Sequence, residues 1–545
     1  MKNKSLIIII LFIYIGCSTK AQAPAFQWAK SVGGSGFDDG YGVSSDASGN
    51  VYVTGAFLSP SITFGTFTLT NAGGYDIFIT KYDVLGNVLW AKNAGGNGDD
   101  FAYSISINAG NVFITGSFRS STLVFGTTTL TNTAGGWDNV FIAKYDASGN
   151  VLWAKRAIGT GVGNSVSTDS NGNVFVSGWF SNPGITFGTF TLPNTGDYNI
   201  FITKYDASGN VIWAKSAGDI TTNATSVVAD VTGNLFVTGG FTTPTITFGT
   251  FTLTNAAAFQ MDIFIAKYDA TGNVLWAKSA GGTFSDYGGC ISTDAFGNAF
   301  VTGVFSSPSV VFGTYTLTNG SGFLVKYDTN GNILWANSSA GGYGKSVTID
   351  AINNIFLTGT FGPTLSLGTT TLTSVGFFDI FIAKYDATGN LLWTKSVGGT
   401  GNDYGQTIST FGTGNAFIAG FFRSPTIAFG TTTLTNVNTN NSTDFYVASL
   451  TDFTGIENYT DEKGFNIFPN PNNGLFTLQI DASPGAAPIV NGEIILINSL
   501  GQKIHEQKVI QGINNITTNG LSTGLYNYIL LEDKQKINSG KLVVE

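Results

Sequence analysis

Seven tryptophans recur along this chain at intervals of 58 to 63 residues, each inside a variant of the phrase YDASGNVLWAKSAGG. A repeat of this length and regularity is typical of architectures built from copies of one supersecondary unit. The body of the protein is therefore predicted to be one unit repeated seven times. The repeated tryptophans are Trp28, Trp90, Trp153, Trp213, Trp276, Trp335 and Trp393.

One repeat, taken from Tyr145 to Ala217, predicts four strands in up-and-down order, which describes a blade of a β-propeller. Asp-x-x-Gly-Asn segments supply the turns, since glycine accepts the positive φ that a short hairpin loop needs. Residues 185–192 alternate with period two and predict an additional small hairpin. Small residues on the first strand suit the crowded axis, and tryptophan on the fourth strand suits the wedge between neighbouring blades.

The two ends of the repeat region complement each other. Trp28 has no upstream hairpin partner, and the seventh unit ends at residues 444–448 with no tryptophan strand after it. Pairing the strand around Trp28 with the strand around Tyr446 would remove both unpaired edges, which otherwise favour aggregation. We therefore predict an all-β fold, a seven-bladed β-propeller over residues 24–452 closed by an N-terminal strand.

The repeated phrase also carries a family resemblance. Over residues 27–452 the chain resembles the bacterial SBBP-type β-propeller repeat proteins, whose units contain the phrase DIFIAKYDASGNVLWAK. That resemblance implies an exported protein and assigns it no activity.

The last part of the chain carries a second set of motifs. Its residues are Pro469, Asn470, Pro471, Gly474, Gly501, Gly524, Tyr526, Gly540 and Lys541. With these motifs, residues 465–545 are similar to type IX secretion C-terminal sorting domains. The resemblance implies a small C-terminal β-sandwich that the type IX secretion machinery of the outer membrane recognises. The polar, charged residues 453–464 before it are predicted to form a linker.

The N-terminal residues 1–23 are predicted to be a signal peptide. Lys2 and Lys4 precede an apolar run that is too short to span a bilayer, so the mature chain is expected to have no transmembrane span. Cleavage after Ala23 and lipidation at Cys17 both stay open. The expected location is outside a Gram-negative bacterium, either secreted or on the cell surface. Cys290 would then have no cysteine partner, so no disulfide framework is expected.

Composition excludes several kinds of function. The net charge is −9 and only three residues are arginine, which argues against nucleic acid as a partner. His505 is the one histidine and lies in the predicted sorting domain, which removes catalytic triads and most zinc sites from the propeller. Cys290 is expected to be a small buried residue, and the aspartates of the Asp-x-x-Gly-Asn turns are expected to shape the turns.

Glycine-rich connections follow four of the tryptophan strands, starting at Gly33, Gly95, Gly281 and Gly398. Three of them match the GGxGxD core of calcium-binding toxin repeats. Backbone carbonyls with Asp38 or Asp403 would hold calcium weakly. The alternative is a tight turn between blades, and no other cofactor is expected.

These connections share one face of a propeller with the variable loops after the second strand, and such loops usually carry function. We expect a binding or adhesion scaffold for glycan or protein and predict no catalytic residues. The alternatives are a polysaccharide lyase or glycosidase using carboxylates such as Asp99 and Asp403, and a purely structural surface-layer protein. The candidate ligand-binding residues are Phe37, Asp99, Phe101, Arg119, Phe284, Tyr287, Asp403, Tyr404 and Arg423.

Overall fold

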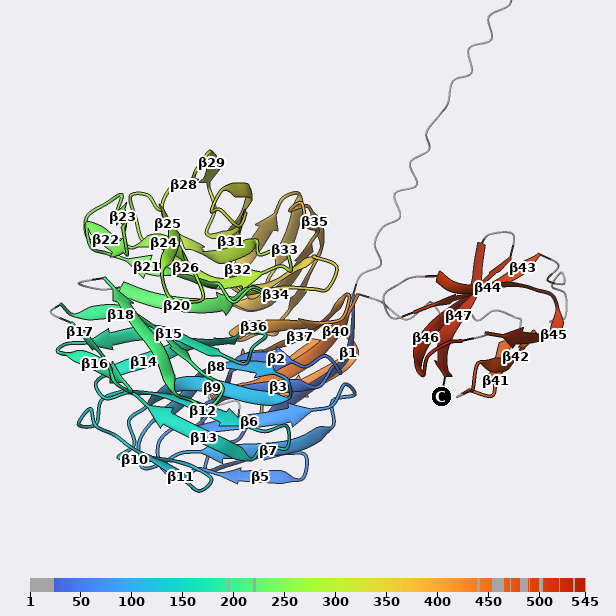
Figure 1. Cartoon of the computed structure of the whole chain (residues 1–545), viewed down its shortest axis with the longest axis horizontal. Coiled ribbons are helices and arrows are strands. Elements are labelled where there is room, and N and C mark those ends of the chain that lie inside the picture. The colour runs from blue at the N-terminus through green and yellow to red at the C-terminus, as the bar shows by residue number, and fades with distance from the viewer. Residues whose placement is uncertain are drawn as a thin grey trace, which may run out of the picture. The chain divides into compact units, whose positions relative to one another are not determined.

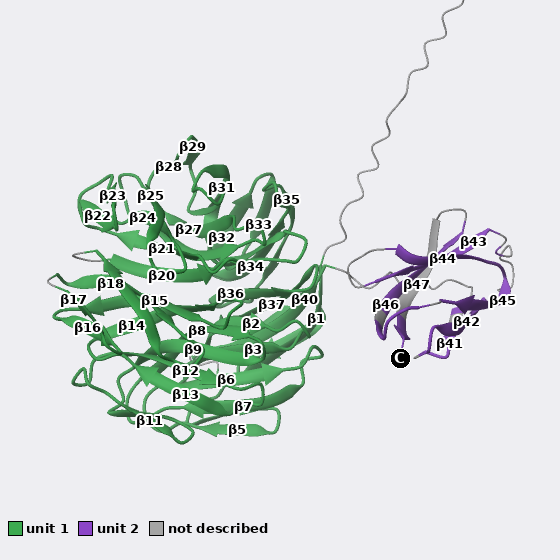
Figure 2. Ribbon diagram, viewed as in Figure 1, with its two compact units in different colours: residues 1–452 green, residues 453–545 purple. Residues whose placement is uncertain are grey.

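A computed structural model of the chain describes residues 24–452 apart from 195, 219–221 and 439–441, and residues 465–544 apart from 471, 481–488, 490, 499–502, 519 and 533–534. The chain divides into two compact units, Met1–Asp452 and Phe453–Glu545 (Figure 2). The predicted signal peptide with Cys17, the linker 453–464, Pro471 and Gly501 lie outside the described residues. The regular elements of the described residues are all strands. None of those residues forms a helix long and apolar enough to cross a bilayer.

Each repeat of the larger unit forms a four-stranded antiparallel sheet in up-and-down order, as in β2-β3-β6-β7. The fifth and sixth repeats share one continuous sheet, because β31 is the outer strand of one repeat and then the inner strand of the next. The strands of these sheets are β2 (Asp38–Ser45), β3 (Val51–Phe57), β6 (Asp76–Tyr82) and β7 (Val88–Ala94); β8 (Asp100–Asn108), β9 (Asn111–Phe118), β12 (Asn139–Tyr145) and β13 (Val151–Arg156); β14 (Gly161–Thr168), β15 (Val174–Ser181), β18 (Tyr198–Tyr205) and β19 (Val211–Ala217); β20 (Thr222–Ala229), β21 (Leu235–Phe241), β24 (Asp262–Tyr268) and β25 (Val274–Ala280); β26 (Asp286–Thr293), β27 (Ala299–Phe305), β30 (Gly322–Tyr327) and β31 (Ile333–Ile349); β32 (Ile355–Leu367), β34 (Asp379–Tyr385) and β35 (Leu391–Val397); and β36 (Asp403–Phe411), β37 (Asn415–Phe422), β40 (Asp444–Thr451) and β1 (Ala25–Val32).

The segment with period-two alternation forms a two-stranded hairpin in each repeat. Its buried side chains, such as Ile62 and Phe64, point into the core, and the alternate threonines face solvent. The hairpins are β4 (Ser61–Phe64) with β5 (Phe67–Thr70), β10 (Thr122–Phe125) with β11 (Thr128–Thr131), β16 (Gly184–Phe187) with β17 (Phe190–Pro193), β22 (Thr245–Phe248) with β23 (Phe251–Thr254), β28 (Ser309–Phe312) with β29 (Tyr315–Thr318), the end of β32 with β33 (Thr370–Thr373), and β38 (Thr426–Phe429) with β39 (Thr432–Thr435).

The N-terminal strand β1 is the outer strand of the last sheet. It pairs antiparallel with β40, and Ser31 lies opposite Tyr446. The innermost strand of the same sheet, β36, also contacts the innermost strand of the first sheet, β2: the hydroxyls of Ser45 and Ser409 are 2.9 Å apart. Figure 1 shows the sheets following one another around the unit, with β1 beside β40. The pairing expected from the two ends of the repeat region is therefore present.

Six of the seven repeated tryptophans dock their sheet onto the next one, whereas the Nε1 of Trp393 is buried without a hydrogen-bond partner among the described residues. The indole Nε1 of Trp28 donates to the carbonyl oxygen of Val84 (2.9 Å) and that of Trp90 donates to Ala147 (3.0 Å). Both carbonyls belong to the Asp-x-x-Gly-Asn turn of the following sheet. Trp153, Trp213, Trp276 and Trp335 make the equivalent bond. The tryptophan is thus a structural residue of the junction between sheets.

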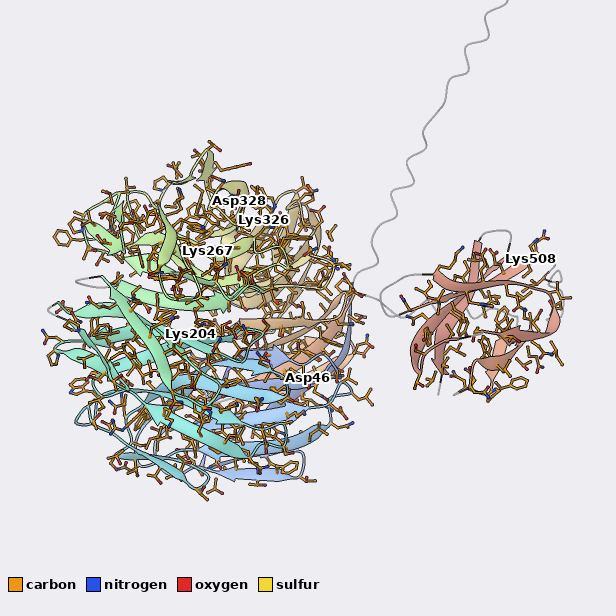
Figure 3. The ribbon with its side chains drawn as sticks, in the orientation of Figure 1. Asp46, Lys204, Lys267, Lys326, Asp328 and Lys508 are labelled. Atoms are coloured by element: carbon orange, nitrogen blue, oxygen red, sulfur yellow. The ribbon has the colours of Figure 1, made fainter. Side chains whose placement is uncertain are left out.

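The lysine of the same phrase reinforces the junction. The Nζ of Lys204 donates to the carbonyl oxygen of Ala270 (3.0 Å), which also accepts from Trp213, and it lies 5.1 Å from the ring centre of Phe175. Lys267 and Lys326 are placed in the same way (Figure 3). The repeated lysine, tryptophan and turn therefore encode one interlocking contact.

The smaller unit has two antiparallel sheets around one hydrophobic cluster that includes Leu478, Ile494 and Leu530. The Oδ1 of Asn470 accepts from the backbone N–H of Val543 (2.8 Å), and the hydroxyl of Tyr526 donates to Ser522 (2.7 Å). Its strands are β41 (Phe465–Phe468), β42 (Leu475–Ile480), β43 (Gly492–Ile497), β44 (Lys503–Val509), β45 (Gly512–Thr517), β46 (Gly524–Glu532) and β47 (Gln535–Val544).

Candidate functional site

The end of the larger unit that carries the Asp-x-x-Gly-Asn turns is chemically uniform. In one of them the Oδ1 of Asp146 accepts from the backbone N–H groups of Ser148 and Asn150, and the Oδ2 accepts from the Asn150 side chain (2.8 Å). These hydrogen bonds lower the pKa of Asp146. Asp46, Asp83 and Asp206 bond in the same pattern. These carboxylates hold turns together and leave no free group for a ligand.

Toward the opposite end, the innermost strands share a backbone feature at which the side chains vary. Each innermost strand has a β-bulge at the same position, where one residue has no partner on the second strand. A bulge re-aims the side chain of the extra residue and often occurs beside functional sites. The bulge is at the same position in each repeat, but the residue there varies, with six residue types at seven positions. The bulged residues, which we call the bulge ring, are Tyr41, Tyr103, Asn164, Thr225, Gly289, Lys345 and Gln406.

A second set of varied residues lies two positions earlier on the same strands. Its aromatic members are half-buried. Phe101 stacks on Tyr103 of the bulge ring, with ring centres 5.8 Å apart and an angle of 8°, and Tyr103 lies 5.7 Å from Tyr41. On another side, Asn164 donates to the Oδ1 of Asn223 (2.7 Å). This end thus has an aromatic side and an amide side. The second set, the rim ring, is Asp39, Phe101, Val162, Asn223, Tyr287, Tyr343 and Tyr404.

Charged groups surround the two rings. Asp39 accepts from the Tyr41 hydroxyl (3.1 Å) and from Thr443, and its burial raises the pKa of the carboxyl. Arg119 forms a two-bonded ion pair with Asp138 (3.0 and 3.2 Å). The Arg423 guanidinium lies 5.7 Å from the ring centre of Phe37.

The structure gathers most of the residues named from the sequence at this end. Phe101, Tyr287 and Tyr404 belong to the rim ring, because they are the second residue of their innermost strands. Phe37, Asp99, Phe284, Arg119 and Arg423 lie on the loops that adjoin it.

Asp403 does not fit the role expected of it. Its side chain is 0% exposed and accepts from the Ser424 hydroxyl (2.7 Å) and the Gly399 N–H (2.8 Å). It fixes the loop after the second strand, as Asp100 does with Ser120 (2.6 Å). The expectation that Asp403 contacts a ligand is therefore corrected: its buried carboxylate holds the loop in place.

Sequence reasoning missed the bulge ring and four of the seven members of the rim ring. These residues lie in the strand interpreted as a run of small residues, in which Gly40-Tyr41-Gly42 and Gly342-Tyr343-Gly344-Lys345 alternate small and large. The glycines face the packed interior: a Cβ at Gly344 would lie 2.2 Å from the Thr302 hydroxyl. That alternation of small and large residues could have revealed the two rings. If the glycines face the packed interior, the large residues between them face the other side of the strand.

The glycine-rich loops pack against pairs of buried aspartates. Four innermost strands begin with aspartate, and in each case the third strand of the preceding sheet also begins with aspartate. The other three innermost strands begin with another residue, and so do the third strands that precede them. The loop glycines make room for them, since a Cβ at Gly95 would lie 2.1 Å from the Asp76 carboxyl. The pairs are Asp76 with Asp100, Asp262 with Asp286, Asp379 with Asp403, and Asp444 with Asp38.

Each pair is short of hydrogen-bond donors. The Oδ1 atoms of Asp76, Asp262, Asp379 and Asp444 are buried without a hydrogen-bond partner. Burial raises the pKa of Asp76 to about 6, and burial with the nearby Asp76 charge raises the pKa of Asp100 to about 7. Within the described ranges no three His, Cys, Asp or Glu side chains are grouped so as to hold a metal ion. The glycine-rich loops thus form turns between sheets, and calcium binding there stays a prediction.

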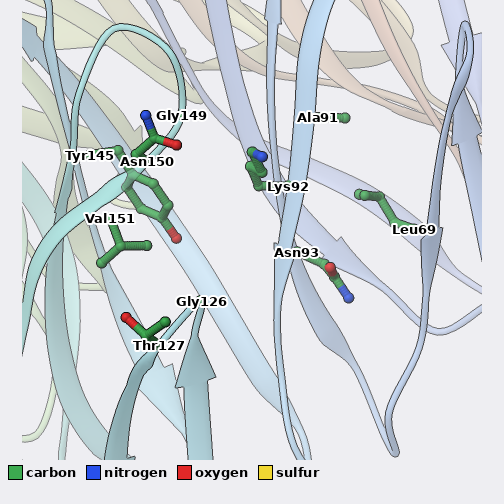
Figure 4. Close-up of a pocket in the computed structure, with 10 residues that line it drawn as sticks. All are labelled: Leu69, Ala91, Lys92, Asn93, Gly126, Thr127, Tyr145, Gly149, Asn150 and Val151. Atoms are coloured by element: carbon green, nitrogen blue, oxygen red, sulfur yellow. The ribbon is translucent and has the colours of Figure 1, made fainter.

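A cavity of about 450 Å³ lies elsewhere, between the outer strands of two neighbouring sheets. Leu69, Lys92 and Asn93 line one side of it, and Tyr145 and Asn150 lie on the other (Figure 4). Most of its wall belongs to the repeated turn and the outer strand. It therefore lacks the unrepeated chemistry of the two rings.

Comparison with known proteins assigns the smaller unit. Residues 466–545 match the family described as a secretion system C-terminal sorting domain. This unit is thus similar to the sorting domains of secreted proteins, as expected from its sequence. Because such a sorting domain directs export, the protein is secreted or held on the surface of a Gram-negative bacterium.

The repeat region has more distant relatives. The chain is 25% identical to an uncharacterized WD repeat-containing protein of Acanthamoeba polyphaga mimivirus, over 80% of this chain and 39% of that protein, so it spans about two fifths of its relative's length. Among solved structures it is similar to the Dos1 propeller (8% identity, 78% of this chain and 95% of that one, TM-score 0.38). It is also similar to PorZ, a surface component of the type IX secretion system of Porphyromonas gingivalis (9% identity, 94% and 75%, TM-score 0.28).

Proposed function

We propose that this protein is a closed seven-bladed propeller of the SBBP type that is exported by the type IX machinery and binds a glycan at the end carrying the two rings. The observation that carries the proposal is the bulge ring. The seven positions equivalent in backbone geometry hold six different residue types, whereas the residues at the sheet junctions recur. Variation confined to one end of a rigid scaffold is typical of a binding site.

The chemistry of the rings favours sugar over protein as the ligand. Three tyrosines of the rim ring come from neighbouring repeats: Tyr287, Tyr343 and Tyr404. Burial raises the pKa of Tyr343, and the nearby Tyr287 and Tyr404 raise it further. Aromatic faces stack on the apolar face of a sugar ring, and amides such as Asn164 bond its hydroxyls. Held on the cell surface by its sorting route, such a propeller serves adhesion or capture.

The enzymatic alternative lacks a suitable pair of carboxylates. Glycoside hydrolysis needs two carboxyl groups across one scissile bond. Asp403 is buried, Asp138 is paired with Arg119, and Asp99 accepts from the backbone N–H of Tyr75 (3.1 Å). No observation therefore favours a lyase or a glycosidase over a binding module.

The test is a glycan array probed with the full-length protein and with variants of equal melting temperature. Tyr103→Ala and Tyr404→Ala should weaken binding at least tenfold, because each removes a stacking face. Tyr315→Ala, on the exposed hairpin strand β29, is the matched control and should bind as the parent does. Cleavage of a polysaccharide by the same preparation would indicate the enzyme, and no binding at all would leave a structural surface-layer role.

A further inference from the structure

We infer that Lys345 and the gap beside it at Gly289 form a subsite for an anionic group, so that the ligand of the ring-bearing end is an acidic glycan. This inference rests on the proposed function and adds the class of sugar. It starts from two neighbouring members of the bulge ring, one with a cation and one with no side chain.

Lys345 is a cation without a counter-ion. Its side chain is half-buried, and its Nζ lies 5.4 Å from the ring centre of Tyr343. The described residues offer it neither a hydrogen-bond acceptor nor a carboxylate, whereas Arg119, Lys267 and Lys326 each have an aspartate. Burial lowers the pKa of Lys345. An unpaired ammonium at such a position is unfavourable unless a ligand supplies the anion.

Gly289 holds the equivalent position in the adjacent repeat, and its packing does not require glycine. An added Cβ would meet nothing closer than 3.4 Å, an ordinary van der Waals distance. Its neighbour Gly288 differs, because a Cβ there would lie 2.2 Å from the Thr238 hydroxyl. Gly289 therefore has room for a Cβ and carries no side chain, whereas each of the other repeats places a side chain at this position.

The position without a side chain at Gly289 adjoins Lys345. One of the atoms nearest to the added Cβ is the carbonyl oxygen of Gly344, at 3.6 Å, and Gly344 directly precedes Lys345. Tyr287 and Tyr343 stand on the same two strands, two residues before Gly289 and Lys345. A sugar stacked on these tyrosines would direct a carboxylate into the gap toward the ammonium, as a charge-assisted hydrogen bond requires.

The experiment uses matched pairs of acidic and neutral sugars. Titration calorimetry would compare the full-length protein with oligogalacturonate and its methyl ester, sialyllactose and lactose, and sulfated and unsulfated galactan oligomers. At least one acidic member should bind ten times more tightly than its neutral partner. Lys345→Gln should remove that preference, so that the acidic member binds no more tightly than its neutral partner.

Two further variants separate charge from shape and from folding. Gly289→Gln fills the gap, and because its Cβ is accommodated it should fold and lose acidic binding at least tenfold. Lys155→Gln makes the same substitution on an exposed outer strand and should change nothing. Lys345→Gln should also melt close to the parent, because it breaks no hydrogen bond or ion pair that the described residues show and loses only the contact with the Tyr343 ring.

The outcomes distinguish this inference from the proposed function. Equal binding of the acidic and neutral members of every pair, or an acidic preference that survives Lys345→Gln, overturns the inference and leaves glycan binding standing. Failure of every sugar to bind overturns both. A lower melting temperature of Lys345→Gln would mean that the lysine serves the fold.

Discussion

The indole N–H of Trp90 donates a hydrogen bond of 3.0 Å to the carbonyl oxygen of Ala147, in the turn of the next sheet. The glycine of that turn, Gly149, lies against the indole: a Cβ added to it would be 2.9 Å from the ring. Gly86 has the same relation to Trp28, and Gly209 to Trp153. Two requirements therefore favour glycine in the Asp-x-x-Gly-Asn turn. Its φ is positive, and a side chain there would clash with the tryptophan ring.

Gly149→Ala should destabilise the protein by more than backbone strain alone explains. Gly110 is the matched control, because its φ of +76° resembles the +79° of Gly149 but an added Cβ would meet only the Ala147 methyl group at 3.7 Å. We expect Gly110→Ala to cost about 1 kcal/mol, from strain. Gly149→Ala should cost about 1–3 kcal/mol more, from overpacking. Urea denaturation checks both values, and equal losses would remove the steric role of the indole.

This contact shows what the sequence can and cannot predict. Seven copies of Trp and Asp-x-x-Gly-Asn revealed the strands, their order and the partner of β1, because packing at a repeated junction demands the same residues each time. The bulge ring could not be found in that way, since its members, such as Tyr41 and Lys345, share a backbone position but have no side chain common to all of them. Asp403 was misplaced for a related reason: an aspartate after a glycine-rich loop has the same sequence pattern whether it faces a ligand or holds the loop.

The sorting domain should be required for export past the outer membrane. A chain truncated after Asp452 keeps every strand of the larger unit, so it should fold and accumulate in the periplasm. Cell fractionation and protease shaving of the native host would measure this. Normal appearance of the truncated chain outside the cell would contradict the assignment, and restoring residues 453–545 should restore export.

Removing β1 should open the last sheet. Deletion of residues 24–34 exposes the edge of β40, which β1 covers from Phe445 to Thr451. An uncovered edge lowers stability and invites pairing with other chains. We expect a melting temperature lower by several degrees and association that rises with concentration, measured by calorimetry and light scattering. Unchanged melting and a monomeric state would show that β1 does not close the unit.

The paired aspartates should make the protein more stable at pH 5 than at pH 7.5. The folded-state pKa values of Asp76 (about 6) and Asp100 (about 7) lie above the ordinary 3.8. Stability linked to a raised carboxyl pKa is fully present below the ordinary value and is lost as the pH rises through the folded value. Each such carboxyl group should contribute about 1–3 kcal/mol to the difference in unfolding free energy between pH 5 and pH 7.5. Thermal melting across this range measures the sum.

A natural substitution within the chain supplies the variant that tests this account. Asn139 occupies the position equivalent to Asp76: its Oδ1 accepts from the Thr133 N–H (2.8 Å) as the Asp76 carboxylate accepts from Ala72, and its Nδ2 donates to the carbonyl oxygen of Gly159 (2.8 Å). Asp76→Asn should therefore raise stability at pH 7.5 by about 1–2 kcal/mol, by supplying a donor and removing a buried charge. The reverse change, Asn139→Asp, should lower it.

Calcium gives the opposite expectation for the same variant. If the glycine-rich loops bind the ion through Asp76 and Asp100, millimolar calcium should raise the melting temperature at pH 7.5 by mass action, and Asp76→Asn should abolish that rise. If the pair instead shares a proton, calcium should leave the melting temperature unchanged and Asp76→Asn should stabilise the protein. We expect the second result, because the Asp100 carboxylate already accepts from the hydroxyl and the N–H of Ser120. Calcium titration of the parent and of Asp76→Asn decides between the two.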